Sequence, residues 1–381
     1  MWKICLYIFV LTVISACKEK YDLPFAGPAA GYLVIDGVIN GGEGPTTIRL
    51  TRSLGLVDTE PFRYVNGATV RIEGEDNSYQ TLLPAPDGIY HSPQLHFTDG
   101  IKYRLYILTP DGKEYASDYI TPLKTPDIDT LTWERNDAGV TLYVNTHDPQ
   151  NKTIYYRWEY EETWEIHSAF YSTLVWQTYP NGNPYDVDPR DPLESELMYT
   201  CWRNQNSSVL LLGSSAKLTR DTIHLPFMLI RPGDERLSVL YSINVTQYAV
   251  SKDGYEFLQR MKKNTEQVGS LFDAQPSELV GNVKCLTDPD ETVIGFVEIA
   301  EAKQKRLWIR RSEVSPWNYL PACSENTVVN DPDSLELFAA YLPTQVHKTS
   351  PGGDTLSVYV ATPVCVDCRL RGTPVKPAFW P

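Results

Sequence analysis

Hydrophobic and polar residues alternate along most of the first third of the chain. In the segment TVRIEG, for example, Val70 and Ile72 alternate with the charged residues Arg71 and Glu73. A period of two places every second side chain on the same face of a β-strand. Turn residues separate these segments, at GGEGP over residues 41–45 and at Asp111-Gly112. We therefore predict that residues 31–122 form a β-sandwich of the immunoglobulin, fibronectin or transthyretin style.

The alternation continues beyond a linker that contains Pro122 and Pro126. The segment IYYRWEYEE places Tyr156, Trp158 and Tyr160 on one face of a strand. We predict a second sandwich-like domain over residues 123–381, so that the fold class is mainly β with two such domains.

One segment of this second domain has helical spacing. Ser251 is a suitable N-cap, Leu258 and Met261 are three residues apart, and Gly269 is a stop signal. We expect one helix near residues 252–268, packed on the second domain.

Residues 163–205 lack a regular period and are rich in aromatic side chains and prolines. Tryptophan and tyrosine provide a large contact area with a polar group, and they are concentrated where proteins bind other molecules. Such residues also fill the cores of β domains, and the sequence leaves this alternative open. We interpret the segment as a long insertion whose candidate ligand-binding residues are Trp164, Tyr171, Trp176, Tyr179 and Trp202.

The first residues have the pattern of a bacterial lipoprotein signal. An apolar run over residues 4–14 follows Lys3 and is too short for a membrane span, which needs about 20 apolar residues. Ile14-Ser15-Ala16-Cys17 matches the lipobox, in which small residues precede the cysteine that receives the lipid. We predict a signal peptide over residues 1–16, lipidation of Cys17 and a tether over residues 17–30. The alternative is an ordinary secretory peptide with a chance cysteine.

The formal net charge of −14 narrows the choice of partners. A nucleic-acid-binding surface needs an excess of basic residues, so we expect no nucleic acid partner. Lipid chains at Cys17 would then provide the contact with the bilayer.

Five cysteines remain after Cys17, and outside the cytoplasm cysteines are normally oxidised. We predict two disulfides drawn from Cys201, Cys323, Cys365 and Cys368, with Cys285 unpaired. The spacing of Cys365 and Cys368 also suggests zinc or redox chemistry, but no second pair stands at ligand spacing.

The motifs of known enzyme classes do not appear in the sequence. The six histidines form no HExxH pattern, and the glycines at 41–44 precede no helix that could hold a phosphate. The acidic loop with Asp186, Asp188 and Asp191 could offer oxygens to calcium, but it lacks the EF-hand pattern. We therefore expect no enzymatic activity, no cofactor and no metal.

Several segments together resemble the domain-of-unknown-function 4249 family. They are YLVIDGVIN, TTIRLTRS, YSINVTQYAVSKDGYEFL, GNVKCLTDPDETVIGFV and, as the most specific part, the tail CVDCRLRGTPVKPAFW. The resemblance implies an outer-membrane lipoprotein of Bacteroidota, often encoded beside a TonB-dependent transporter. We accordingly expect a non-enzymatic binding component on the cell exterior that assists this transporter in nutrient uptake. The alternative is a structural or adhesive surface protein.

The same resemblance implies O-glycosylation at Asp-Ser/Thr followed by an aliphatic or small residue. The pattern occurs at Thr355, Thr130, Ser334 and Thr222. A glycan needs an exposed position, and on this basis we rank Thr355 first and Thr222 last. We expect an intact mass above that of polypeptide plus lipid in protein from the native host, and a mass explained by those two alone would disprove the hypothesis.

The lipoprotein prediction can be tested at Cys17. We expect Cys17→Ala to remove metabolic palmitate labelling and to move the protein from the outer membrane to soluble or inner-membrane fractions, because the thiol is the acceptor of the lipid. Labelling that survives this substitution would disprove the assignment.

Overall fold

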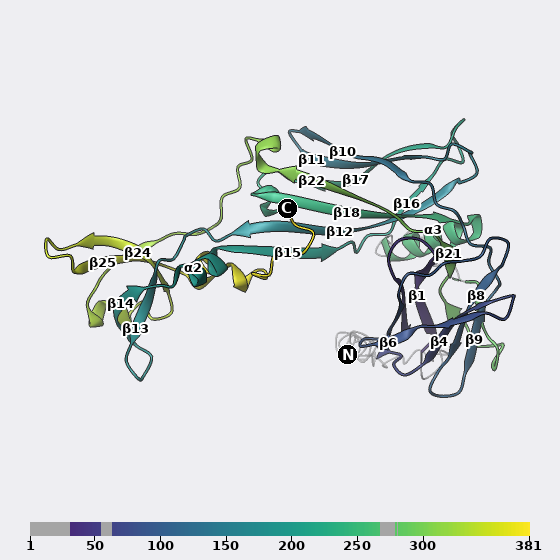
Figure 1. The fold of residues 1–381 in the computed structure, drawn as a ribbon, viewed down its shortest axis with the longest axis horizontal. Coiled ribbons are helices and arrows are strands. Elements are labelled where there is room, and N and C mark those ends of the chain that lie inside the picture. Colours follow the sequence, from purple (N-terminus) through teal and green to yellow (C-terminus); the bar gives the residue numbers. More distant parts are fainter. Residues whose placement is uncertain (1–30, 55–62, 267–278, 280) are drawn as a thin grey trace, which may run out of the picture.

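The computed structural model describes residues 31–54, 63–266, 279 and 281–381. The predicted signal peptide, Cys17, the tether and Gly269 lie outside these residues. The described chain is mainly β and consists of three parts (Figure 1): an N-terminal sandwich, a central sandwich and a distal lobe that projects away from both. The predicted fold class is thus confirmed, with the distal lobe as an addition.

Two sheets form the N-terminal sandwich, and the predicted hairpins are present in it. The first sheet has the order β20-β1-β2-β7-β6, with β21 beside β1 and β3 beside β2, and the second has the order β19-β9-β8-β4-β5. Their strands are β1 (Leu33–Asn40), β2 (Thr46–Arg52), β3 (Arg63–Tyr64), β4 (Thr69–Gly74), β5 (Tyr79–Thr81), β6 (Leu83–Ala85), β7 (Ile89–Ser92), β8 (Tyr103–Leu108), β9 (Glu114–Ser117), β19 (Val283–Cys285), β20 (Val293–Ile294) and β21 (Glu298–Ala300).

The domain boundaries differ from the sequence prediction, which assigned residues 123–381 to the second domain. Strands β20 and β21 pair in parallel with β1, and β19 pairs antiparallel with β9. Val283, Cys285, Val293, Val297 and Ile299 are all buried in the N-terminal core. This sandwich is therefore discontinuous in sequence, because parallel strands must be joined by a long crossover, here the whole central part of the chain.

Two further sheets face each other in the central sandwich. They have the orders β10-β11-β17 and β15-β12-β18-β22, with β16 beside β12. The strands are β10 (Ile128–Asn136), β11 (Gly139–His147), β12 (Tyr155–His167), β15 (Thr200–Asn206), β16 (Leu211–Ser214), β17 (Thr222–Ile230), β18 (Leu240–Val250) and β22 (Lys303–Arg310), with short 3-10 turns η1 (Glu235–Leu237) and η2 (Arg311–Val314).

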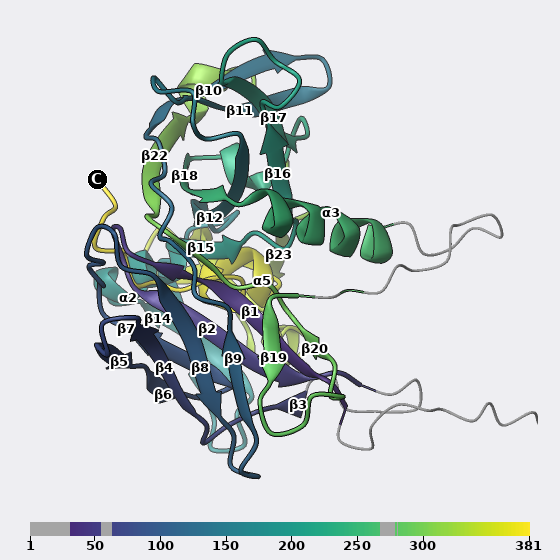
Figure 2. The same cartoon turned by 90° about the vertical axis from the view of Figure 1, so that its right-hand side faces the viewer.

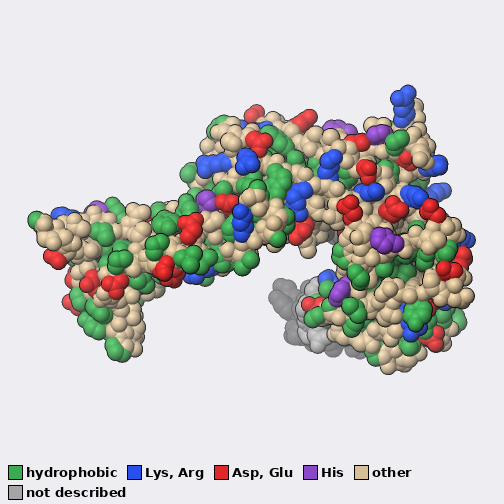
Figure 3. Space-filling model, in the orientation of Figure 1, with side chains coloured by type: hydrophobic (Ala, Val, Ile, Leu, Met, Phe, Trp, Pro, Cys, Tyr) green, Lys and Arg blue, Asp and Glu red, His purple; other side chains and the backbone are tan. Residues whose placement is uncertain are grey.

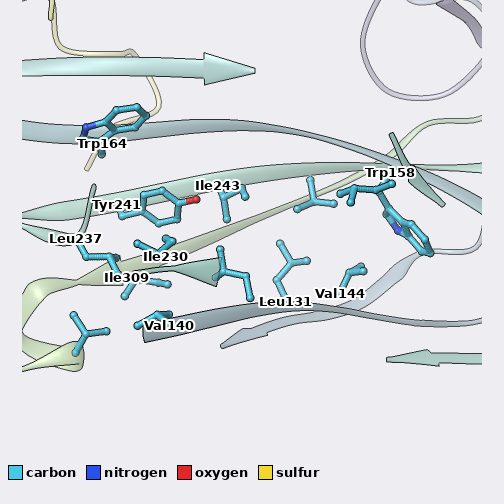
Figure 4. Close-up of a cluster of buried hydrophobic side chains, with 14 of the residues drawn as sticks. Leu131, Val140, Val144, Trp158, Trp164, Ile230, Leu237, Tyr241, Ile243 and Ile309 are labelled. Carbon is cyan, nitrogen blue, oxygen red and sulfur yellow. The ribbon is translucent and has the colours of Figure 1, made fainter. Parts of the chain in front are cut away.

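Aromatic and aliphatic side chains from both sheets fill the core between them (Figure 4). Tyr156 and Trp158 on β12 are 0% and 1% exposed, and Tyr160 packs against the same cluster. The alternation seen in the sequence thus gave the correct buried face. Each such side chain contributes about 1.5–3 kcal/mol to stability through burial.

The predicted helix is α3 (Lys252–Glu266), and Ser251 caps it as expected, since its Oγ accepts the Gly254 N–H at 3.0 Å. It packs between the two sandwiches (Figure 2). Phe257 approaches Phe296 of the N-terminal sandwich with ring centroids 5.7 Å apart, and Tyr255 approaches Tyr155 of the central sandwich at 4.7 Å.

Much of the predicted aromatic insertion belongs to the distal lobe. This lobe combines β13 (Leu174–Thr178) and β14 (Pro184–Pro189) with β23 (Asn326–Val329), β24 (Leu342–Thr349) and β25 (Thr355–Ala361) from the C-terminal part. Further short helices accompany it, so α3 is not the single helix that we predicted: α2 (Pro192–Tyr199), α4 (Pro332–Glu336), α5 (Pro363–Val366) and η3 (Cys368–Leu370). The buried core of the sheets in this lobe is small, comprising Leu174, Val328, Leu335, Val358 and Val360.

Two disulfides hold this lobe and the C-terminal tail in place. They join Cys201 to Cys368 and Cys323 to Cys365, and Cys285 is free and buried. The prediction of two disulfides from these four cysteines is confirmed. Such cross-links suit a lobe whose apolar core is too small to supply much stability by itself.

The discontinuous sandwich leads to a prediction for fragments. A fragment of residues 31–122 lacks five buried side chains, worth about 1.5–3 kcal/mol each, which is comparable to the whole stability of a small domain. We expect this fragment to remain unfolded, and we expect a fusion that adds residues 281–301 through a Gly/Ser linker to unfold cooperatively in urea, followed by circular dichroism. The same fusion with Val297→Asp and Ile299→Asp is the control and should not fold. Cooperative unfolding of the short fragment alone would contradict this account.

Candidate functional site: the cleft between the sandwiches

A cleft of ≈ 1340 Å³ lies where the N-terminal sandwich meets the central sandwich. Its walls come from five segments: residues 96–100 before β8, the linker 121–126, residues 147–155 between β11 and β12, residues 249–252 at the start of α3, and the connection from β21 to β22 around Glu301 and Lys303. Charged side chains of both signs lie along this junction on the face that Figure 3 shows.

The wall formed by residues 147–155 is held rigid by two buried carboxylates. Asp148 accepts the backbone N–H groups of Gln150, Lys152 and Thr153 at 2.8–2.9 Å. Although burial acts in the opposite direction, these bonds keep the pKa of Asp148 below its usual value. Asp221, which is 6% exposed, accepts the Asp148 N–H at 2.8 Å. The wall is therefore formed in advance of any ligand.

His147 faces the cleft beside Asp129. Its Nδ1 lies 2.7 Å from Asp129 Oδ2, and both side chains are more than a third exposed. This hydrogen bond, together with the negative charge of Asp129, raises the pKa of His147. The cleft thus holds a histidine whose protonated form is favoured by its neighbour.

Other charged groups of the cleft also form pairs. Lys124 lies 3.1 Å from Asp99, and Lys303 lies 3.3 Å from Asp127. Exposed pairs of this kind are weak, so a polar ligand can replace one partner at little cost.

Phe97 supplies an apolar surface at the same site. A Cβ at Gly41 would lie 2.4 Å from the Phe97 ring, so the glycine allows the ring to pack on the β1–β2 turn. The combination of an aromatic face with polar side chains of both signs suits binding of a polar or zwitterionic molecule.

No arrangement for covalent chemistry is apparent in the described part of this cleft. The Ser251 hydroxyl donates a hydrogen bond to Glu298 at 2.5 Å and accepts one from the Gly254 N–H. Both hydrogen bonds hold the start of α3 in place. Within the described ranges, no group of three or more His, Cys, Asp or Glu side chains could hold a metal ion.

The model of the family described as "Domain of unknown function (DUF4249)" matches residues 18–306. The chain belongs to this family. The match stops before the tail over residues 365–380, which we had taken as the most specific part of the resemblance. No curated protein matches the DUF4249 chain.

Two solved structures resemble this DUF4249 protein at low identity. Two fibronectin type III domains of chicken tenascin are 10% identical, with 74% of this chain and 98% of that chain covered and a TM-score of 0.17. The calcium-binding domain CBD12 of CALX1.1 is 8% identical, with 73% and 99% covered and a TM-score of 0.18. These scores are too low to support an inference, so the fold assignment rests on the strand pairing alone.

The predicted ligand-binding aromatics do not form one surface. Trp164 is 4% exposed in the central core, and Trp202 is 8% exposed beneath the C-terminal tail, where it packs with Trp380. Both lie on regular strands, β12 and β15, which the sequence interpretation had treated as part of an irregular insertion. For these two residues the core alternative was correct.

The remaining three aromatics lie on or near the distal lobe. Trp176 packs against its core and donates its Nε1–H to the Tyr341 carbonyl at 2.8 Å. Tyr171 contacts Tyr199 edge to face at 5.2 Å. Tyr179 is 47% exposed at the tip of the β13–β14 hairpin and is the most accessible of the three. None of these residues lines the cleft.

The acidic loop that suggested calcium has structural contacts instead. Asp186 accepts from the Asn330 side chain at 2.7 Å, and Asp191 caps α2 by accepting the Leu193 N–H at 2.7 Å. These carboxylates therefore do not converge on a common point among the described residues.

The solvent exposure of the glycosylation candidates does not follow the order in which the sequence ranked them. Thr355 and Ser334 are half-buried, whereas Thr130 and Thr222 are exposed. We ranked Thr222 last because it precedes an apolar run, but on β17 the side chains alternate and Thr222 points outward. Exposure alone would now place Thr130 and Thr222 first.

The residues of the cleft escaped the sequence interpretation. His147 and Asp129 are 18 residues apart and meet because β10 and β11 pair as a hairpin. The regular register of that hairpin, which pairs Thr130 with Asn145, would set Asp129 opposite Thr146. The register shifts between Ile128 and Thr130, and no pattern in the sequence indicates this shift. The facing wall, residues 96–100, comes from another domain, and no local signal indicates it.

Proposed function

We propose that this DUF4249 protein is a lipid-anchored, non-enzymatic binding protein of the outer membrane, facing the cell exterior. It captures a polar solute in the cleft between its sandwiches and passes it to a neighbouring TonB-dependent transporter.

The observation that carries the proposal is the preformed cleft of ≈ 1340 Å³. Typical small-molecule sites enclose about 300–1,000 Å³, so this one has room for an oligomeric nutrient. Its charged groups are already paired with one another, and Asp148 fixes one wall. A ligand would therefore bind without first ordering the site, which reduces the entropic cost of association.

The predicted anchor supports the location. The lipobox at Cys17 and the tether that follows would keep the protein at the membrane, and the family resemblance supports a transporter as the neighbour. None of the helices in the described ranges is long and apolar enough to cross a membrane.

One observation favours the alternative of a structural or adhesive protein. The distal lobe projects from the sandwiches (Figure 1) and exposes large apolar side chains, with Tyr179 at 47% and Leu337 at 80%. Exposed apolar residues in one region indicate contact with another protein.

Purification of the protein from its native host distinguishes the binding function from the adhesive one. Trp380 is packed into the fold, so the affinity tag should be inserted at the exposed turn Asp137-Ala138 and not at the C-terminus. We expect a stoichiometric transporter in mild detergent and a bound small molecule in native mass spectrometry.

Charge reversals then test the cleft. The double variant Lys303→Glu/His147→Ala should bind the small molecule at least tenfold more weakly, because both residues line the cleft. This loss of affinity is equivalent to about 1.4 kcal/mol. Lys348→Glu on the distal lobe is the matched control and should leave binding unchanged. Purified protein that carries neither transporter nor solute would contradict the proposal and favour the adhesive alternative.

A further inference from the structure

A buried glutamate joins the N-terminal sandwich to α3. Glu298 lies on β21 and is 5% exposed. Its neighbours Val297 and Ile299 point into the sandwich core, so the Glu298 side chain lies on the opposite face of the sheet, toward α3. A carboxyl group buried to this extent needs strong partners to remain charged.

One oxygen of this carboxyl group binds the start of the helix. Oε1 accepts the Ser251 backbone N–H at 3.0 Å and the Ser251 hydroxyl at 2.5 Å. The helix can approach this closely only because residue 254 is glycine, since a Cβ there would lie 2.0 Å from Oε1. Glu298 and Ser251 therefore form a clasp between two parts of the chain that are 47 residues apart.

The other oxygen, Oε2, is buried without a hydrogen-bond partner. An ionised carboxylate in this position leaves half of its charge unsolvated, whereas a protonated carboxyl group keeps both bonds to Ser251 at much lower cost. Burial, which outweighs the bonds from Ser251, raises the pKa of Glu298 to about 7, and the charge of Asp253 acts in the same direction.

The other charged groups near the clasp do not offset this effect. Lys252 is exposed and lies 3.9 Å from Glu256 on the solvent side of α3. Asp36, on the same face of the neighbouring strand β1, is exposed, and Glu301 is half-buried beyond the end of β21. None of the three acts on Glu298 as Asp253 does.

The clasp lies at the wall of the cleft. Ser251 and Lys252 both line it, and α3 continues from them between the two sandwiches. Phe257 against Phe296 is the next contact between α3 and the N-terminal sandwich. A change at Ser251 therefore alters the cleft wall directly.

We propose that protonated Glu298 holds the first turn of α3 against the N-terminal sandwich, and that loss of this proton releases the turn and loosens the cleft. Binding of a solute in the cleft thereby responds to pH near neutrality, a regulation that rests on the proposed function.

Hydrogen exchange of the ligand-free, full-length protein tests the clasp separately from ligand binding. The amides to follow are those of Gly254 and Tyr255, which bond to Ser251. In the open turn Glu298 has its ordinary pKa near 4.5, and in the closed turn a pKa of about 7. Between these values the opening constant should rise by up to about tenfold per pH unit, beyond the intrinsic dependence of exchange, and level off above about pH 8. From pH 5 to 7 the expected change is about fortyfold.

Variants assign this dependence to Glu298. Glu298→Gln keeps an oxygen for Ser251 but cannot ionise, so its opening constant should not vary with pH. Glu256→Gln removes an exposed charge from the same helix and should behave as the wild type. Asp253→Asn should lower the pH at which the opening constant becomes constant, because the charge of Asp253 raises the pKa of Glu298. This variant provides the test if Glu298→Gln does not fold.

Two results would overturn the inference: a wild-type opening constant that does not change from pH 5 to 7, or an unchanged slope in Glu298→Gln. Failure to find a solute in the cleft would overturn the proposed function but would leave this exchange profile as it is.

Discussion

The parallel pairing of β1 with β20 and β21 is the contact on which the arrangement of this protein depends. Because these strands return to the N-terminal sandwich only after the whole of β10 to α3, that sandwich is completed by residues that follow the central part of the chain. The junction is reinforced where Leu123 of the linker pairs with Ala300. The chain therefore passes between the two sandwiches three times, and these passages form walls of the cleft.

The cleft itself illustrates how a polar site is kept open and ordered. Its ionic groups are largely exposed and neutralise one another in pairs, so that none imposes a large desolvation cost. Two buried carboxyl groups order the backbone of its walls: Asp148 fixes a loop, and Glu298 fixes the start of a helix.

The distal lobe depends on a different source of stability. Its sheets bury only a few apolar side chains, and it is composed of two segments separated by more than a hundred residues. The Cys201–Cys368 bond ties the C-terminal segment to β15 of the central sandwich, and the Cys323–Cys365 bond closes a loop within that segment; both restrict the unfolded chain. An oxidising location, which the predicted lipobox would also imply, is consistent with this construction.

The sequence by itself determined the features that depend on residues close together in the chain. Alternation specified strands of the N-terminal sandwich and the buried face of the first part of β12, the hydroxyl of Ser251 marked the start of α3, and the cysteines outside the cytoplasm were expected to pair except Cys285. These features follow from local geometry and from single side chains, so they can be predicted without the tertiary structure.

Only the tertiary structure decided which distant segments meet. Nothing in the pattern of residues 283–300 reveals that their partners are β1 and β9. The aromatic residues Trp164 and Trp202 could equally fill a core or form a surface, because burial depends on what packs above them. The cleft, and Glu298 against Ser251, exist only through contacts between residues far apart in sequence, whose energies depend on burial that no local pattern encodes.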